Sequence, residues 1–127
     1  MQGGVHPDLK IDYYERVLSG IKERFKIHCH CFSPPEILNI AKVSKLTLAE
    51  TFERLKKAGL DSMPGGGGEI LDDEIRTDIS PLKCTTDEWL NTHRIAHQQG
   101  LRTTGTMMMG VGETIHHRIR HFQRIRD

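Results

Sequence analysis

The chain has 127 residues, of which 36% are hydrophobic and 28% are charged, proportions typical of one soluble globular domain. Its formal net charge of +1 gives no strong field, which argues against a nucleic-acid or membrane-surface partner. The apolar runs are too short to span a membrane, no signal peptide is visible at Met1, and the odd number of cysteines, three, fits a reducing cytoplasm.

The first third of the chain predicts a helix, a strand and a second helix. Over Asp12–Phe25 apolar residues recur at helical spacing, and Asp12 with Glu15 resembles a capping box at the start of the helix. The apolar segment Ile27–Ser33 predicts a strand that ends at two prolines, and Glu36–Val43 predicts a short helix after it.

The middle of the chain repeats this order. Thr47 and Glu50 form a capping box that opens a helix, which Gly59 ends. Leu60–Met63 predicts a short strand, which a proline and four glycines break, and Glu69–Ile79 is a candidate helix.

The last third repeats the order once more. Thr85 and Glu88 form another capping box, and the helix that they open ends at Gly100. Leu101–Met109 predicts the next strand, and Thr114–Asp127 predicts a helix with one apolar face.

Helix and strand thus alternate at a period of roughly 25 to 40 residues, which favours βαβ units with parallel strands. We therefore predict an α/β fold, a partial (β/α) TIM-type barrel of about three and a half units, that occupies residues 1–127 as one incomplete domain. Both ends read as truncated, since a closed barrel needs about 250 residues, and sheet edges and apolar surface should stay uncovered. A complete doubly wound domain is the alternative architecture.

Ligands of such folds bind where parallel strands end. The first strand end carries Gly3 and Gly4, whose backbone a ligand can approach closely, followed by His6. The second carries His28 and His30, which share a face of the predicted strand and could hold a polar substrate or shuttle protons. Buried structural histidines, or a metal-dependent hydrolase that uses the pair, are the alternatives.

The exit of the second strand and the two later strand ends add further candidates. Ser33 and Glu36 offer a hydroxyl and a carboxylate to a ribose or an amino group. The run Gly65–Gly68, after Pro64, matches neither a Walker loop nor a dinucleotide fingerprint, and we interpret it as backbone that wraps closely around a ligand. In the last strand, threonine hydroxyls such as Thr104 should face the barrel interior, whereas the three methionines after Thr106 are more typical of core filling.

The cysteines give no metal site by this reasoning. Cys29 and Cys31 stand in one predicted strand, and we place their side chains on opposite faces, which disfavours joint ligation of a metal ion. Both are predicted to be buried, inert thiols.

Two histidine pairs at four-residue spacing, His93 with His97 and His117 with His121, could in principle bind zinc. No glutamate follows the first histidine of either pair as a general base would, so partly exposed structural roles are predicted. The basic residues of the last helix are interpreted as a solvated face: Arg118, Arg120, Arg124 and Arg126.

Taken together, the strand ends resemble the radical SAM enzymes of the futalosine menaquinone pathway and the related deazaflavin synthase subunit. The segments that carry the resemblance are Met1-Gln2-Gly3-Gly4 with His6-Pro7, His28-x-His30-x-Phe32-Ser33-Pro34-Pro35-Glu36, Gly59-Leu60-Asp61-Ser62-Met63-Pro64-Gly65-Gly66, Glu69-Ile70-Leu71 and Thr104-x-Thr106-Met107-Met108. Two further segments, residues 41–46 and 83–89, are most similar to the cyclase subfamily, and the aminofutalosine synthase subfamily is the nearest competitor.

The resemblance implies a β/α barrel that uses S-adenosylmethionine (SAM) and, in the full-length enzyme, a [4Fe–4S] cluster. It further implies a small nucleoside-derived substrate and an electron donor such as flavodoxin or ferredoxin. Reductive cleavage of SAM would give a 5′-deoxyadenosyl radical that abstracts hydrogen from the substrate before ring closure. A non-catalytic nucleotide-binding α/β module is the alternative from another functional class.

By motif position, the residues expected to bind SAM are Gly3, Gly4, Ser33, Glu36, Thr106, Met108 and Gly110. The residues expected to bind substrate are His6, His28, His30, Pro64, Gly65, Gly66 and Thr104.

This sequence departs from the family pattern at three points. Thr106 replaces the first glycine of a Gly-x-Ile-x-Gly-x-x-Glu segment that supports adenine, and Val111 replaces a histidine that follows Gly110 in many relatives. The Cys-x3-Cys-x2-Cys loop that holds the cluster is absent, so the chain contains no cluster ligands and should not perform the reaction alone.

Overall fold

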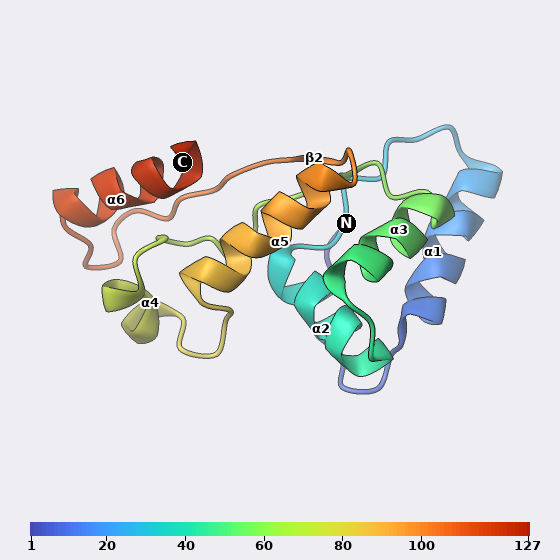
Figure 1. Ribbon diagram of the computed structural model, residues 1–127, viewed down its shortest axis with the longest axis horizontal. Coiled ribbons are helices and arrows are strands. Elements are labelled where there is room, and N and C mark those ends of the chain that lie inside the picture. The colour runs from blue at the N-terminus through green and yellow to red at the C-terminus, as the bar shows by residue number, and fades with distance from the viewer.

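A computed structural model describes all 127 residues. Six helices and two short strands form in the order α1 (Ile11–Arg24), α2 (Pro34–Ser44), α3 (Leu48–Ala58), β1 (Ser62–Met63), α4 (Asp73–Ile79), α5 (Thr86–Gln98), β2 (Arg102–Thr103) and α6 (Ile115–Arg126). Figure 1 shows α1, α2 and α3 gathered at one end of the molecule and α4 and α6 at the other, with α5 between them.

Side-chain caps mark where every helix except α1 begins. At α3 the Thr47 hydroxyl accepts a hydrogen bond from the Glu50 amide (3.2 Å), and the Glu50 carboxylate accepts one from the Thr47 amide (2.8 Å). The capping box predicted at Thr85 forms in the same way at α5, and Thr114 caps α6. Each cap satisfies amides that the first helical turn leaves without partners.

The starts of the first two helices differ from the prediction. Lys10 is the N-cap of α1 and has no capping side chain, so the box predicted at Asp12 is wrong; Asp12 lies in the first turn and pairs with Arg54 instead (2.6 Å). Helix α2 begins at Pro34 rather than at Glu36, because Ser33 and Glu36 form its capping box. Proline fits the first helical position, where no amide partner is needed.

Four extended segments lie side by side and parallel, in chain order. The Met1 ammonium donates to the His30 carbonyl (2.7 Å) and the Phe32 amide donates to the Met1 carbonyl (3.1 Å), which is the alternating pattern of a parallel pair. His30 bridges Ser62 in parallel, and β1 pairs in parallel with β2. Parallel neighbours in chain order are what successive βαβ units produce.

The predicted strands are nevertheless too long. Residues 27–33 contribute a single bridge, β1 covers only the end of Leu60–Met63, and β2 stops at Thr103 instead of continuing to Met109. The architecture is therefore helix-rich with a small parallel sheet, and these short strands do not make the barrel wall that the sequence predicts.

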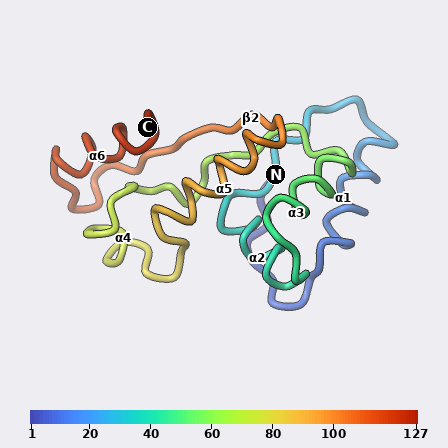
Figure 2. Tube along the Cα trace, in the orientation of Figure 1, coloured from blue at the N-terminus to red at the C-terminus, as the bar shows by residue number.

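The helices cover one face of this sheet and enclose the core. Phe52, Leu55 and Leu18 are fully buried in a cluster that also takes up Met63 of β1. In Figure 2 the extended segments cross the molecule above α1, α2, α3 and α5. None of the helices is both long and apolar enough to cross a membrane.

Both strand cysteines point into this core. Cys29 and Cys31 are 4% and 3% exposed and belong to the same apolar cluster. Side chains two residues apart share a face of a strand, so our assignment of the two thiols to opposite faces is wrong. Their predicted burial is confirmed.

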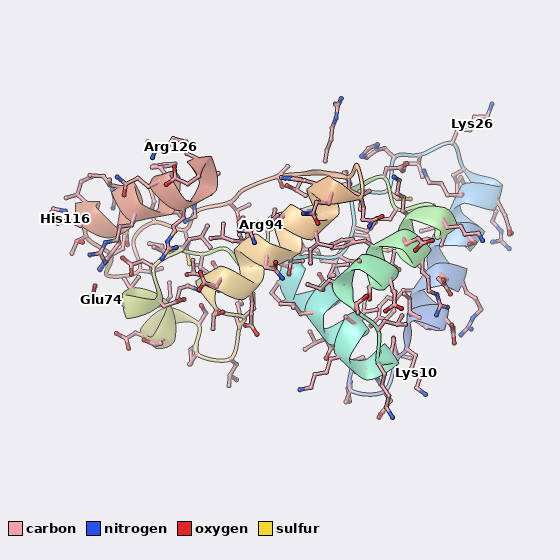
Figure 3. The ribbon with its side chains drawn as sticks, viewed as in Figure 1. Lys10, Lys26, Glu74, Arg94, His116 and Arg126 are labelled. Atoms are coloured by element: carbon pink, nitrogen blue, oxygen red, sulfur yellow. The ribbon has the colours of Figure 1, made fainter.

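Helix α4 is shorter than the segment predicted for it, because it begins only after Asp72, whose carboxylate accepts a hydrogen bond from the Glu74 amide (3.2 Å). Helix α6 forms as predicted. It is attached beside α4 through His121, whose Nδ1 accepts a hydrogen bond from the Leu71 amide (3.0 Å). In Figure 3, Glu74 of α4 and His116 of α6 mark this end of the molecule.

Candidate functional site

Glu36 joins the first two strand ends. One carboxylate oxygen accepts from the Gly3 amide (2.8 Å), and the other accepts from the Ser33 amide (2.8 Å) and hydroxyl (2.6 Å). Glu36 is only 5% exposed, so these bonds hold a buried charge at the start of α2. Three of the residues predicted to meet SAM are thus brought into direct contact, while Gly4 stays exposed, and a Cβ added there would meet nothing within 4 Å.

The glycine run lies between the first two strand ends and the fourth. A Cβ on Gly66 would stand 3.1 Å from the Gln2 side chain and 3.2 Å from that of Ser33, whereas a Cβ on Gly65 would stand 2.1 Å from the Thr104 carbonyl oxygen. Larger residues would therefore push the strand ends apart. The absence of side chains in this run lets the protein's own backbone segments approach, and a role of Gly65 and Gly66 toward a ligand stays a prediction.

Two threonines attach the fourth strand end to the same run. The Thr104 hydroxyl accepts from the Gly65 amide (3.0 Å), and the Thr106 hydroxyl donates to the Gly65 carbonyl (2.7 Å). Pro64, which precedes Gly65, is buried. Both hydroxyls thus find partners within the protein, although Thr104 and Thr106 are exposed and do not face a barrel interior. The third and fourth strand ends lie together, as predicted.

Arg76, which the sequence reasoning missed, holds the glycine run in place. Its guanidinium is buried and donates to the carbonyls of Gly67 (3.1 Å), Gly68, Ile70 (3.3 Å) and Cys84. Arginine can satisfy several carbonyls at once because its five N–H donors spread from one plane. A buried arginine one turn into α4 has no local sequence signature, since the carbonyls that it binds lie outside that helix.

The remaining SAM candidates lie in the loop before α6. The Met108 amide donates to the Glu69 carbonyl (2.8 Å), which places Met108 beside the end of the glycine run. The Gly110 and Val111 amides donate to the Glu113 carboxylate (3.0 and 2.8 Å). These two bonds, together with a hydrogen bond from Arg118, lower the pKa of Glu113 to about 2. Glu113 therefore stays ionised and shapes its own loop.

His28 and His30 share one face, as predicted, and meet at a third residue. The Ser62 hydroxyl lies 2.7 Å from His28 Nε2 and 2.7 Å from His30 Nδ1. His28 is exposed, His30 is half-buried and Ser62 is buried. Serine at this position was not singled out from the sequence, although its place next to Met63 in a predicted strand puts it on the face opposite the core.

His6 lies apart from that pair. It is exposed, and its Nδ1 accepts from the Asp8 amide (3.2 Å). It lines a cavity of about 190 Å³ together with the first strand end and the aromatic face of α1; the other lining residues include Gly3, Tyr13, Tyr14, Phe32 and Glu36. The residues predicted to bind substrate therefore do not form one group. His6 lines this cavity, whereas His28 and His30 lie on the strand face opposite the core.

The cysteines do not fit an iron–sulfur cluster. Cys29 and Cys31 are buried in the core, and burial raises the pKa of the Cys31 thiol. Cys84 lies in the loop between α4 and α5, where burial raises the pKa of its thiol as well. Cluster ligands are accessible thiolates at suitable spacing, whereas two of these thiols are buried in the core and the third lies in a different loop.

The helical histidines are structural, as predicted, but two are more deeply buried than expected. His93, 7% exposed, stacks on Trp89 with 3.6 Å between ring centres, and burial lowers its pKa. His121, 1% exposed, is held by the Leu71 amide. His97 and His117 are more exposed, and neither pair is arranged around a common ligand point.

One further cluster, Asp72 with Glu74 and His117, brings ligand-type atoms within 4.8 Å of one another. Arg120 already pairs with Asp72 (2.9 Å) and Glu74 (3.3 Å), and the Thr114 amide occupies His117 Nδ1. The cluster therefore serves to dock α6. The four arginines that we interpreted as a solvated face keep substantially exposed side chains, and each of them also pairs with a carboxylate.

Comparison with known proteins gives a consistent family. Residues 1–125 match the profile of the Radical SAM superfamily. The chain is 49% identical to the cyclic dehypoxanthine futalosine synthase of Halalkalibacterium halodurans over 128 residues, which is 100% of this chain and 35% of that protein. The corresponding synthase of Streptomyces coelicolor is 42% identical over 99% of this chain and 32% of its own length.

A second kind of relative is nearly as similar. The 5-amino-6-(D-ribitylamino)uracil–L-tyrosine 4-hydroxyphenyl transferase of Methanococcoides burtonii is 46% identical, over 99% of this chain and 36% of that protein. The chain thus spans about a third of the length of the curated relatives it matches.

Proposed function

The chain belongs to the radical SAM superfamily, and on that premise we propose that it forms the part of a futalosine-pathway cyclase that holds SAM and the substrate dehypoxanthine futalosine. Members of this superfamily have a TIM-type fold, which agrees with the parallel, chain-ordered strand segments. The observation that carries the proposal is the joining of the first two strand ends through Glu36, next to the glycine run.

The SAM side of the site is the surface around Gly3 and Gly4. SAM carries an ammonium group, which needs hydrogen-bond acceptors, and a carboxylate, which needs donors. Backbone groups at glycines can supply both, because no side chain blocks their approach. A Cβ on Gly3 or Gly4 would meet nothing within 4 Å, so the backbone there is open. The buried Glu36 carboxylate adds negative charge behind it. Bound SAM supplies a 5′-deoxyadenosyl radical on reductive cleavage; the protein's task is to orient it and exclude water.

The adenine side of SAM would rest on Thr106, Met108 and Gly110. This loop reaches the glycine run through Thr106 and Met108, so it lies at the same end of the strands as Gly3. Gly110 has open space around it. A flat base can pack on such backbone and on the Met108 thioether.

The substrate side would be the strand face opposite the core. His28 and His30 stand on one segment of that face, and Thr104 stands on the segment that follows β2. Imidazoles and hydroxyls suit a nucleoside-derived substrate that is rich in hydroxyl groups. The [4Fe–4S] cluster needs thiolate ligands that this chain does not offer. An electron donor such as flavodoxin or ferredoxin would deliver its electron to that cluster.

The cyclase is favoured over the transferase by two observations. Identity is 49% to one synthase and 42% to a second, against 41–46% to the transferases. The segment Lys83-Cys84-Thr85-Thr86-Asp87-Glu88-Trp89 resembles the cyclase subfamily, and here it packs on the site, because Trp89 Nε1 donates to the Gly66 carbonyl (3.3 Å) and Cys84 receives Arg76. Aminofutalosine synthase and the deazaflavin-type transferase remain the alternatives.

A segment exchange tests the assignment. Residues 1–127 replace the matching segment of the H. halodurans synthase, and in parallel that of the M. burtonii transferase. Each reconstituted enzyme receives SAM, a reductant and its own substrates, and cyclised product, tyrosine adduct and 5′-deoxyadenosine are measured by mass spectrometry.

We expect cyclised dehypoxanthine futalosine from the first exchange at a rate within about tenfold of the parent, and no tyrosine adduct from the second. Adduct formation by the second exchange with an inactive first one would reassign the chain to the transferases. Loss of both activities, with the cluster absorbance intact, would contradict a role in either reaction.

A further inference from the structure

We propose that Ser62 links His28 and His30 into a two-histidine proton relay, in which one hydroxyl sets opposite hydrogen-bonding roles for the two imidazoles. The hydrogen bonds between Ser62 and the two histidines do not depend on the proposed function. Only the transfer of a proton to a substrate rests on the proposed function. The hydroxyl lies 2.7 Å from His28 Nε2 and 2.7 Å from His30 Nδ1, both within the range of short hydrogen bonds.

The hydroxyl has one proton to give, which determines the arrangement. It can donate to one imidazole and must accept from the other. If His28 Nε2–H donates to Ser62 and Ser62 donates to bare His30 Nδ1, both rings keep a proton on Nε2. If the two hydrogen bonds ran in the opposite direction, both rings would carry their protons on Nδ1. If both facing nitrogens were bare, the single hydroxyl proton could bond to only one of them.

The two histidines at the ends of this hydrogen-bonded chain differ in their exposure to solvent. His28 is exposed to solvent, Ser62 is 6% exposed and His30 is half-buried. No protein group hydrogen-bonds to the remaining ring nitrogens, His28 Nδ1 and His30 Nε2. A proton can therefore enter at His28, and the His30 end opens onto the strand face that we assign to the substrate.

The transfer balances without any other reactant. A hydronium ion from solvent protonates His28 Nδ1 and becomes water, the His28 Nε2 proton passes to Ser62 Oγ, and the original hydroxyl proton passes to His30 Nδ1. His30, now an imidazolium, gives its Nε2 proton to a basic group of the substrate, which leaves both rings protonated on Nδ1. The reverse passage takes a proton from a substrate at His30 Nε2, releases the His28 Nδ1 proton to water and restores the Nε2 tautomer of both rings. In either direction Ser62 ends as a neutral hydroxyl.

The neighbouring charges are few and fixed. The Asp61 carboxylate, next to Ser62, is held by Lys22 and by the Cys29 amide (2.6 Å). Arg102 is the register partner of Ser62 on β2 and is exposed. The Met1 ammonium binds the His30 carbonyl, not its ring. None of these groups hydrogen-bonds to either imidazole, so the hydroxyl is the sole direct link between the two rings.

Nitrogen NMR on the 127-residue chain, with ¹⁵N-labelled histidine, reads the two rings directly and needs no cofactor. At pH 8 we expect His28 Nε2 to carry a proton, His30 Nδ1 to be bare, and the two rings to show single tautomers. In Ser62→Ala both rings should revert to the tautomer mixture of the exposed His116, whereas Ser62→Thr, which keeps the hydroxyl, should restore the wild-type pattern.

The relay is overturned if His28 Nε2 and His30 Nδ1 are both protonated or both bare in the wild type. It is also overturned if the Ser62→Ala spectrum matches the wild type while the amide spectrum shows the same fold. The result stands apart from SAM and substrate: failure of the segment exchange leaves the tautomers unchanged, and failure of the tautomer pattern leaves the SAM surface unaffected.

Discussion

The Glu36 carboxylate accepts a hydrogen bond from the Gly3 amide, with 2.8 Å between the two atoms, although 33 residues separate them. This contact ties the first strand end to the N-terminus of α2. The same side chain closes the capping box of α2 through Ser33. One buried carboxylate therefore fixes both the local start of a helix and the placement of a glycine pair at the candidate site.

Replacing Glu36 by alanine should cost about 2–3 kcal/mol of unfolding free energy, because the Gly3 amide and the Ser33 amide and hydroxyl lose their acceptor in a buried place. Urea unfolding followed by circular dichroism measures the change. Glu50→Ala removes the equivalent residue of an exposed capping box and should cost about 1 kcal/mol or less. Equal losses in the two variants would show that Glu36 is only a helix cap.

Arg76→Ala should destabilise the chain by about 3 kcal/mol, since carbonyls from Gly67 to Cys84 lose a shared donor inside the protein. Arg76→Lys should not restore the loss, because an ammonium cannot span the same carbonyls. Arg94, labelled on α5 in Figure 3, hydrogen-bonds only to Asn91 and is the matched control. If Arg94→Ala and Arg76→Ala unfold at the same urea concentration, the glycine run is held by other contacts.

Gly65→Ala should cost about 2 kcal/mol or more, because the added Cβ would stand 2.1 Å from the Thr104 carbonyl and force the third and fourth strand ends apart. Gly3→Ala, where the added methyl meets nothing within 4 Å, should leave the unfolding midpoint unchanged. Thermal unfolding compares the two. A neutral Gly65→Ala would mean that the strand ends are not in contact as described.

Acidification should release α6 from the rest of the chain. Burial, and then the charge of Arg76, lower the pKa of His121, whose Nδ1 must be bare to accept from the Leu71 amide. Because the pKa is lowered in the folded state, the contribution of His121 is complete above its ordinary value of 6.5 and is lost as the pH falls below it.

Hydrogen exchange at the Leu71 amide measures this release. Its protection, corrected for the intrinsic pH dependence of exchange, should fall between pH 7 and pH 5, while protection of the α3 amides stays constant. His121→Leu, which cannot accept the bond, should show low Leu71 protection at every pH. Protection that is constant in the wild type over this range would contradict a titrating link.

Local signals in the sequence predicted most of the helices. The capping boxes at Thr47 and Thr85 formed because each needs only residues three apart. The same signal at Ser33 and Glu36 was overlooked because the two prolines between them suggested the end of a strand rather than the first turn of a helix. The parallel strand order also followed from the alternation of elements.

What could not be predicted depends on distant partners. Arg76 and Ser62 matter through contacts with the glycine run and with two histidines 32 and 34 residues away. The lengths of the strands depend on neighbouring segments that donate ladder hydrogen bonds, not on their own β-propensity. The misplaced Cys29 and Cys31 are a different matter, because the two-residue period of a strand already put both on one face.

The account rests on one claim, that the backbone at the first strand end meets SAM. Binding of radiolabelled SAM to the reconstituted synthase that carries residues 1–127, compared between wild type and Gly3→Ala, tests it most directly. Since the methyl group fills only open space in the protein, we predict an unchanged fold and SAM affinity reduced about tenfold or more, about 1.4 kcal/mol. Equal affinity in the two proteins would contradict the claim.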